Sequence, residues 1–216
     1  MKQSVRDSSG KRLEDYKRPS VAVDAAVLSV DPDRGLVVLQ VRGPRKTRWA
    51  LPGTFLHFDE VLSQAVQRCL DEKANVRGVN PRQLRVFDAI KRDSRYRVLS
   101  VAHVAVVGSD QLAGRFPDTT RLVPVGHREK LAFDHNKIID LAVQEVRSRY
   151  HDKPDPDHLL GREFTLRELR LIHEAVEGRA IQRDNFRRAM ENHLEPVGSP
   201  ESSGRPGRPA QRFRRK

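Results

Sequence analysis

The sequence predicts a mixed α/β (α+β) chain in two parts, a larger domain of strands and helices and a small, mainly helical domain after it. Two observations predict the first part: β-rich runs flank an amphipathic helix, and a second amphipathic helix follows them. One observation predicts the division, a charged, proline-broken segment at 151–157 after which the composition changes. The expected organisation is a flexible basic arm at 1–18, a domain at 19–150, a linker at 151–163 and a second domain at 164–216.

The charge and cysteine content narrow the function classes. The 216 residues carry a formal net charge of +12, which favours a polyanionic partner, most often nucleic acid. The alternative is a soluble basic protein without such a partner. A single cysteine excludes an internal disulfide and fits the reducing cytoplasm. No apolar run approaches the length of a membrane span, and the N-terminus lacks the apolar region of a signal peptide.

The expected strands of the first domain are runs rich in β-branched residues. The first two are separated by the Asp-Pro-Asp-Arg-Gly turn at 31–35, which predicts a hairpin. The strands are expected at Val21–Val30, Leu36–Val41, Arg82–Lys91, Arg97–Val107 and Leu122–Val125.

Two helices are expected in the same domain. The first follows Trp-Ala-Leu-Pro-Gly at 49–53, with Asp59 as its cap. Its apolar stripe has a period near 3.6 residues and comprises Val61, Leu62, Ala65, Val66, Cys69 and Leu70. The second begins at Asp134, with Ile138, Ile139, Ala142, Val143 and Val146 on its apolar face.

The loop and helix at 49–76 resemble the Nudix box, in which glycine, five residues, glutamate and seven residues precede Arg-Glu-apolar-any-Glu-Glu-any-Gly-apolar. The first glutamate is kept as Glu60 and the arginine as Arg68. Cys69 stands for the next glutamate, and Glu72 with Lys73 stands for the glutamate pair. The two box glycines are Thr54 and Asn75, and Leu70 and Val76 fill the apolar positions. The resemblance implies an α/β/α sandwich for residues 19–150.

These departures fall where the family holds its metal. Residues three and four apart share a helix face, and in the family positions 69, 72 and 73 supply carboxylates for Mg²⁺. Mg²⁺ prefers hard oxygen ligands, and a neutral thiol is a poor substitute. With Cys69 neutral and Lys73 positive, the local formal charge changes from −3 to about 0. We therefore expect no bound metal, no catalytic residue and little or no hydrolysis, with a binding pocket retained.

From the sequence alone, neither the histidines of this domain nor the segment near its end indicates a catalytic or metal-binding site. His57, His103 and His135 lack metal-ligand spacing, and none is proposed as a ligand. Residues 131–135, Leu-Ala-Phe-Asp-His, are similar to a segment near the end of Nudix domains of the ADP-ribose-related branch. The residues themselves favour a loop and a helix cap.

The second domain begins with two short helices. In Phe164–Gly178, Thr165 and Glu168 form a capping box, Gly178 ends the helix, and the stripe comprises Leu166, Leu169, Ile172 and Val176. The second helix spans residues 183–193, with Phe186, Ala189, Met190 and Leu194 inward. Its exposed polar residues are Arg183, Asn185, Arg187 and Arg188. Arginine and asparagine bind base edges in the major groove, which favours a helix-turn-helix; the alternative is a solvated face of a helical hairpin.

The C-terminal tail is basic and rich in turn residues. Six basic residues and no acid follow position 204, and Gly-Arg-Pro occurs twice. We expect the wing of a winged helix, with Arg205, Arg208 and Arg212 gripping the phosphate backbone or the minor groove of double-stranded DNA. The alternative is a disordered basic tail with non-specific affinity.

This architecture resembles the NrtR-type regulators, which are Nudix-related transcriptional regulators of NAD metabolism. The resemblance covers Pro19 to the C-terminus. It implies a homodimer on a palindromic operator, repression of NAD biosynthesis or salvage genes, no required cofactor, and ADP-ribose or a related nucleotide as effector. Pocket residues carried over are Arg42, Trp49, Phe55, Glu60, Arg68 and Glu72. Arg68 is equally a structural partner of Glu60 or Glu72, and we favour that role.

Two other functions fit the residues. One is an active Mg²⁺-dependent hydrolase of nucleoside diphosphates with a DNA-binding appendage, using Glu60, Glu72 and recruited carboxylates such as Asp71. The other is a non-specific nucleic-acid binder whose tail does most of the binding.

Overall fold

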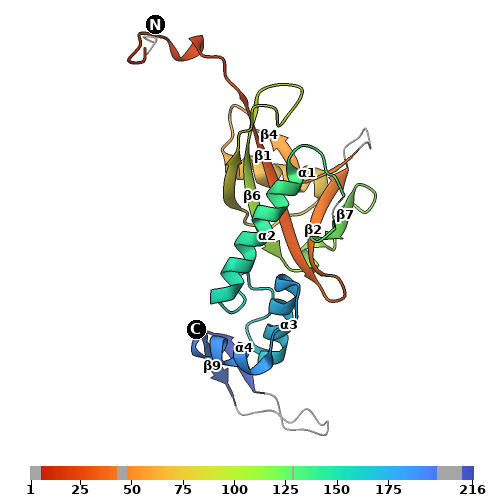
Figure 1. The fold of residues 1–216 in the computed structure, drawn as a ribbon. Coiled ribbons are helices and arrows are strands. Elements are labelled where there is room, and N and C mark those ends of the chain that lie inside the picture. Colours follow the sequence, from red (N-terminus) through yellow and green to blue (C-terminus); the bar gives the residue numbers. More distant parts are fainter. Residues whose placement is uncertain (1–5, 43–47, 128, 199–210) are drawn as a thin grey trace.

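The structure, a computed structural model, describes residues 6–42, 48–127, 129–198 and 211–216. Figure 1 shows the larger domain above the smaller one, with α2 (His135–Asp152) running from one toward the other. Residues 6–18 extend away from the sheet at the opposite end (Figure 1). No helix in the described ranges is long and apolar enough to cross a membrane.

A seven-stranded mixed sheet forms the centre of the first domain. Its main path has the order β3-β2-β1-β6-β5, while β4 pairs with β1 and β7 pairs with β2. The central pair, β1 and β6, is parallel over ten residue pairs, and β1 forms the predicted hairpin with β2. The strands are β1 Ser20–Asp31, β2 Gly35–Arg42, β3 Trp49–Ala50, β4 Gly53–Phe55, β5 Arg82–Phe87, β6 Val98–Val107 and β7 Thr120–Pro124.

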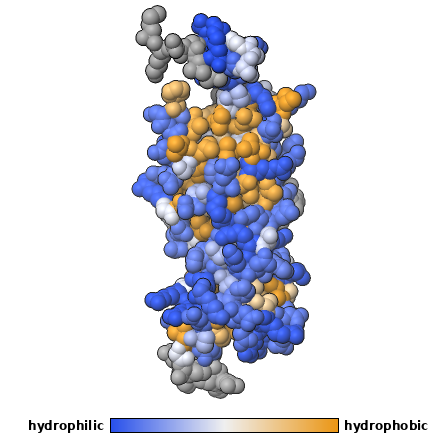
Figure 2. All heavy atoms as spheres, turned by 90° about the vertical axis from the view of Figure 1, so that its left-hand side faces the viewer, coloured by the Kyte–Doolittle hydropathy of each residue, from blue (hydrophilic) through white to orange (hydrophobic). Residues whose placement is uncertain are grey.

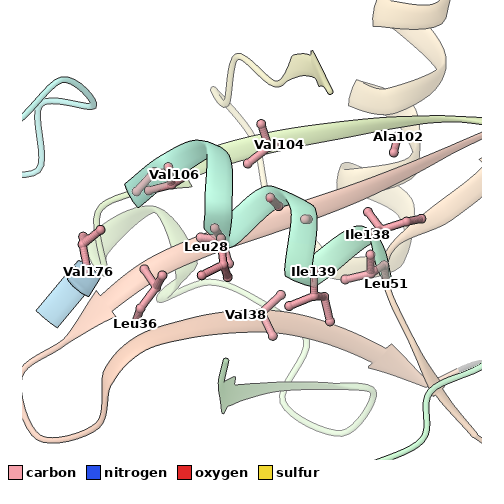
Figure 3. Close-up of a cluster of buried hydrophobic side chains, with 14 of the residues drawn as sticks. Leu28, Leu36, Val38, Leu51, Ala102, Val104, Val106, Ile138, Ile139 and Val176 are labelled. Atoms are coloured by element: carbon pink, nitrogen blue, oxygen red, sulfur yellow. The ribbon is translucent and has the colours of Figure 1, made fainter. Parts of the chain in front are cut away.

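Two helices cover opposite faces of this sheet. Helix α1 (Leu62–Ala74) packs Ala65, Val66 and Leu70 against the face that carries Val23, Ala25 and Val27. Helix α2 packs on the other face, where Ile138 and Ile139 meet Leu28, Leu36 and Val38 (Figure 3). Alternate residues of β1 thus enter two separate cores, as the period-2 geometry of a strand requires. The expected α/β/α sandwich is confirmed.

Two local expectations for this domain were wrong. Asp59 does not cap α1: the N-cap residue is Val61, whose N–H donates to Gln64 Oε1 at 3.0 Å. Strand β5 ends at Phe87 instead of Lys91, because residues 88–96 form turns. Helix α1 ends at Ala74, and its C-cap Asn75 adopts φ 51 at the position where the Nudix box has glycine. Asparagine is among the residues that tolerate this left-handed conformation.

The second domain consists of two helices and a small sheet of order β8-β10-β9. Its elements are β8 Phe164–Thr165, α3 Leu166–Glu177, α4 Arg183–Met190, a short 3-10 turn at Glu191–His193, β9 Leu194–Val197 and β10 Arg212–Arg215. Two further 3-10 turns, Leu13–Asp15 and Asp110–Leu112, lie earlier in the chain. Thr165 and Glu168 form the predicted capping box, and Gly178 ends α3 at φ 75. The second helix was predicted too long, and Ala189 is exposed rather than inward.

The segment between the domains is anchored by a buried acid. Asp155 is fully buried and accepts N–H bonds from Leu159 at 2.8 Å and Leu160 at 2.9 Å. Arg215, at the end of β10, donates to the same carboxylate at 2.7 Å. Because α2 extends to Asp152, the segment predicted as a linker begins inside a helix. Through Asp155, this segment ties the end of α2 to β10.

Helix α3 joins the two domains through packing. Val176 is fully buried in the core beneath α2 (Figure 3), and Ile172 packs against that same core. Arg147 of α2 donates to the Val176 carbonyl at 3.0 Å. His173, between these two residues of α3, contacts the ring of Tyr150 on one side and that of Phe186 in α4 on the other. The second domain is thus packed directly on the end of the first.

Candidate functional site

A cavity of about 700 Å³ opens in the first domain beside β4, the last turn of α1 and the start of α2. The residues that line it come from segments far apart in the sequence. They include Ala22, Asp24, Val41, Arg42, Gly53, Thr54, Phe55, Glu72, Lys73, Arg92, Asp93, Arg95, Phe116, Asp118, Phe133 and His135. Charged groups of both signs and three phenylalanines therefore share one cavity, a composition that suits a charged ligand with an aromatic part.

One side of the cavity is a charged wall made of Asp24, Arg92, Asp93, Arg95 and His135, and Asp24 is its buried centre. Its Oδ2 accepts from Arg92 at 3.1 Å and from the Ser100 hydroxyl, and its Oδ1 lies 3.3 Å from His135 Nε2. Burial alone would raise the pKa of Asp24, but the neighbouring His135 imidazole, the bond from Ser100 and the charge of Arg92 lower it below its usual range. Asp24 is therefore a carboxylate already paired inside the protein.

The segment at 131–135 forms part of this wall. His135 Nδ1 accepts the Leu51 N–H at 2.8 Å, and Asp134 binds Arg92 at 2.8 Å instead of capping α2. Phe133 lines the cavity with φ 53, an uncommon conformation for a bulky side chain. The interpretation of these residues as only a loop and a cap was too limited.

Two half-exposed aromatic rings stand at the same cavity. Phe55 and Phe133 are 43% and 47% exposed, and the Arg95 guanidinium lies 6.0 Å and 5.4 Å from their ring centroids. Asp93 holds Arg95 in place through bonds of 2.9 Å and 2.7 Å. Planar aromatic and guanidinium surfaces that are open to solvent can stack on a ligand base.

The Nudix-box positions do not bring three carboxylates together. Cys69 is buried at 1% exposure, and that burial raises the pKa of its thiol to about 12. Lys73 turns its amine to the Gly53 carbonyl, and Glu72 lies 3.5 Å from Arg68 Nη1. Over the described ranges, no group of three or more His, Cys, Asp or Glu side chains is arranged to hold a metal ion. This donor set does not fit Mg²⁺.

Arg68 and Glu60 bind each other beside the cavity. Arg68 donates to Glu60 at 3.0 Å and 2.6 Å, and also to the Phe55 carbonyl at 3.0 Å. The bond from Arg68 lowers the pKa of Glu60 to about 2. This pair fixes the loop before α1, which is the structural role we favoured for Arg68.

The predicted pocket residues divide into two groups. Arg42, Phe55 and Glu72 line the cavity, whereas Trp49, Glu60 and Arg68 are not among its lining residues. Trp49 instead lies beneath the guanidinium groups of Arg42 and Arg121. Sequence reasoning missed most of the charged wall. The signal for it was the charged run at 91–95 together with the Phe-Asp-His of 133–135.

The second domain presents a polar helix face. Arg183, Asn185, Arg187 and Arg188 are all exposed on α4, while Phe186 and Met190 are buried. Arg188 donates to Asn185 Oδ1 at 2.6 Å, and Arg187 pairs with Glu191 at 3.1 Å. These partners are themselves exposed, so a nucleic acid can displace them at small cost.

The basic residues of the tail differ in position. Arg212 is exposed and donates to the Glu163 carbonyl at 3.0 Å. Arg215, by contrast, is a structural residue bound to Asp155 and lies over the ring of Phe164. Arg205 and Arg208 lie outside the described residues. Because β10 carries the buried Phe213, truncation after Gly198 would remove part of the domain core together with the basic tail.

Comparison with known proteins identifies relatives of both domains. The NrtR DNA-binding winged helix domain matches residues 156–214. The "ADPR responsive transcriptional repressor NtrR" of Acinetobacter baylyi is 30% identical over 210 residues, which are 93% of this chain and 83% of that protein. An "ADP-ribose pyrophosphatase" of Methanocaldococcus jannaschii is 30% identical over 139 residues, covering 64% of this chain and 81% of its own.

Two solved structures extend the similarity. NrtR of Shewanella oneidensis, crystallised with a 27mer DNA, has a TM-score of 0.72 and 31% identity, with 91% of this chain and 93% of that chain covered. The NUDIX domain of that same protein, crystallised with ADP ribose, has a TM-score of 0.54 and 28% identity. That alignment covers 64% of this chain and 95% of the domain.

Proposed function

We propose that this chain, which belongs to the NrtR family of Nudix-related transcriptional regulators, is a DNA-binding repressor whose DNA affinity changes when a nucleotide binds its first domain. The observation that carries the proposal is the pairing of a winged helix domain with a cavity that keeps one of the three carboxylates of a Nudix metal site, Glu72. Relatives named as a repressor and crystallised with DNA support it.

Double-stranded DNA is the proposed partner of α4 and the wing. Arg183, Asn185, Arg187 and Arg188 are exposed together on one helix and match the hydrogen-bonding edges of guanine and adenine. Arg212 sits on the adjoining wing strand, where a phosphate contact positions the helix. Arg205 and Arg208 are proposed to add backbone or minor-groove contacts.

ADP-ribose, or a related nucleotide, is the proposed effector, and the cavity beside Asp24 is its proposed site. The exposed rings of Phe55 and Phe133 suit an adenine, and Arg42 and Lys73 suit a diphosphate. ADP-ribose is the part of NAD that remains when nicotinamide is removed, so a sensor of it would report NAD turnover. Genes of NAD biosynthesis or salvage are therefore the proposed targets.

A homodimer on a palindromic operator is the proposed assembly. Figure 2 shows a broad apolar area on one side of the first domain, the side that lies left in Figure 1. Exposed apolar areas of this kind mark protein–protein contacts, and edge strand β5 exposes Val86 at 44%. Two copies joined through this domain would present two α4 helices to symmetric half-sites. A shift from dimer to monomer mass in Val86→Glu, by light scattering, would support this interface.

We propose that the chain does not hydrolyse its ligand. Among the carboxylates considered for a hydrolase, Glu72 alone lines the cavity, while Glu60 is bound to Arg68 and Asp71 to Arg77. The similarity to an ADP-ribose pyrophosphatase favours hydrolysis as the second candidate. Mg²⁺-dependent turnover of ADP-ribose that is lost in Glu72→Gln would establish that candidate.

Selection of bound sequences from a random double-stranded DNA pool tests the repressor proposal. We expect a palindromic consensus with half-sites about one helical turn apart, or a multiple of it. Arg187→Ala should then weaken binding to this consensus by roughly 10-fold or more, since a good base contact is worth about 1–3 kcal/mol. The control Arg77→Ala removes the same charge from the first domain and should bind as the wild type does. Recovery of no consensus would refute sequence-specific repression.

A further inference from the structure

The divalent metal that the Nudix box implies does not fit the residues at its three carboxylate positions. Cys69 faces the core with a protonated thiol, and Glu72 is shared with Arg68. The third position is a lysine, which places a positive charge where a cation would bind. Nearby Asp24 cannot substitute readily, because Arg92 and His135 already engage it.

We propose that Lys73 takes the place of the metal: its ammonium neutralises the diphosphate of the effector, so that the nucleotide binds without Mg²⁺. This inference rests on the proposed function, because it concerns the effector of the same cavity. A sensor built in this way would respond to nucleotide concentration alone, independently of free Mg²⁺.

The geometry of Lys73 supports this role. The residue lies in the last turn of α1 and lines the cavity together with Gly53, whose carbonyl accepts a hydrogen bond from its amine. An ammonium has three N–H donors. In the described part of the chain, one of these donors binds the Gly53 carbonyl, which holds the amine at the side of the cavity. The other two donors can reach a ligand. A lysine ammonium binds phosphate as a point charge.

The charges around Lys73 favour an anion as well. Asp24 and Asp93 are each paired with an arginine of the same wall, Arg92 and Arg95. Their negative charges are therefore compensated within the protein. Arg42 and Asp118 also line the cavity, with opposite charges. A diphosphate bound here would face lysine and arginine where a hydrolase of this family presents metal-bound carboxylates.

Titration calorimetry of ADP-ribose into the full chain, stripped of metals, tests the inference in EDTA and in Mg²⁺. We expect dissociation constants that agree within about twofold between the two conditions. Lys73→Ala should weaken binding by roughly tenfold or more in both, the loss typical of a hydrogen bond to a charged group. Lys73→Glu, which puts a carboxylate next to Glu72, should bind only when Mg²⁺ is present. Lys153→Ala, exposed beyond the end of α2, is the matched control and should bind as the wild type does.

Two results would overturn the inference while leaving the proposed function intact. One is wild-type binding that requires Mg²⁺, and the other is unchanged affinity in Lys73→Ala. Absence of ADP-ribose binding in both conditions would overturn the effector assignment itself, and this inference with it. Circular dichroism spectra of each variant establish that a loss of binding is not a loss of fold.

Discussion

The ion pair between Asp155 and Arg215 should be a major source of stability in the second domain. The carboxylate is completely buried, and the Arg215 side chain is only 18% exposed. Removal of one partner from a buried pair leaves the other charge unpaired and costs about 3–5 kcal/mol. We therefore expect Arg215→Ala to lower the free energy of unfolding by about that amount, a factor of at least 100 in the ratio of folded to unfolded protein.

The neighbouring arginine provides a matched control. Arg214 pairs with Glu195 at 2.7 Å, but both side chains are more than 40% exposed. Exposed pairs contribute about 0–1 kcal/mol, so Arg214→Ala should be close to the wild type in stability. Urea denaturation followed by circular dichroism measures both variants, with Asp155→Ala as the reciprocal test. Equal stability losses in the two arginine variants would refute the role assigned to Asp155.

Three further perturbations follow from single sites. Gly53→Ala would place a methyl group 2.1 Å from Asp24 Oδ1. We expect the free energy of unfolding to fall by about 1–3 kcal/mol and calorimetry to show weaker ADP-ribose binding. The control is Gly161→Ala, because Gly161 has open space around it. Burial lowers the pKa of His173 to about 4 from an ordinary 6.5, so the unfolded chain takes up this proton first. The free energy of unfolding should then fall by about 3 kcal/mol as the pH drops from 6.5 to 4. Thermal melts across this pH range should show a smaller fall in His173→Phe. Thr165→Ala should cost about 1 kcal/mol by loss of the α3 cap, and an unchanged melting temperature would contradict this.

The fold could be predicted where one local signal dominates. The hairpin of β1 and β2, the stripe of α1 and the capping box of α3 each depend on residues close in sequence. Element ends were less predictable, because tertiary contacts decide them. The Val61 N–H takes Gln64 as its partner instead of Asp59, and the second helix of the C-terminal domain ends early, at Met190.

The candidate site was harder to predict because its residues meet only in the folded chain. Asp24 lies in the middle of a strand among small apolar residues, and its partners Arg92 and His135 are more than sixty positions away. The box resemblance located Glu72 and Lys73 but carried over Glu60 and Arg68, which bind each other. Spacing alone could not separate a residue that lines the cavity from one that fixes the loop beside it.

Fluorescence anisotropy of the selected DNA duplex at fixed salt, with ADP-ribose titrated into its complex with the full chain, tests the central claim most directly. We predict sequence-selective binding whose affinity changes as the nucleotide saturates the cavity, because a ligand shifts an equilibrium by its differential affinity for two states. Gly53→Ala should keep DNA binding and weaken the response. DNA affinity that is indifferent to both sequence and ADP-ribose would contradict the account and leave a non-specific basic binder.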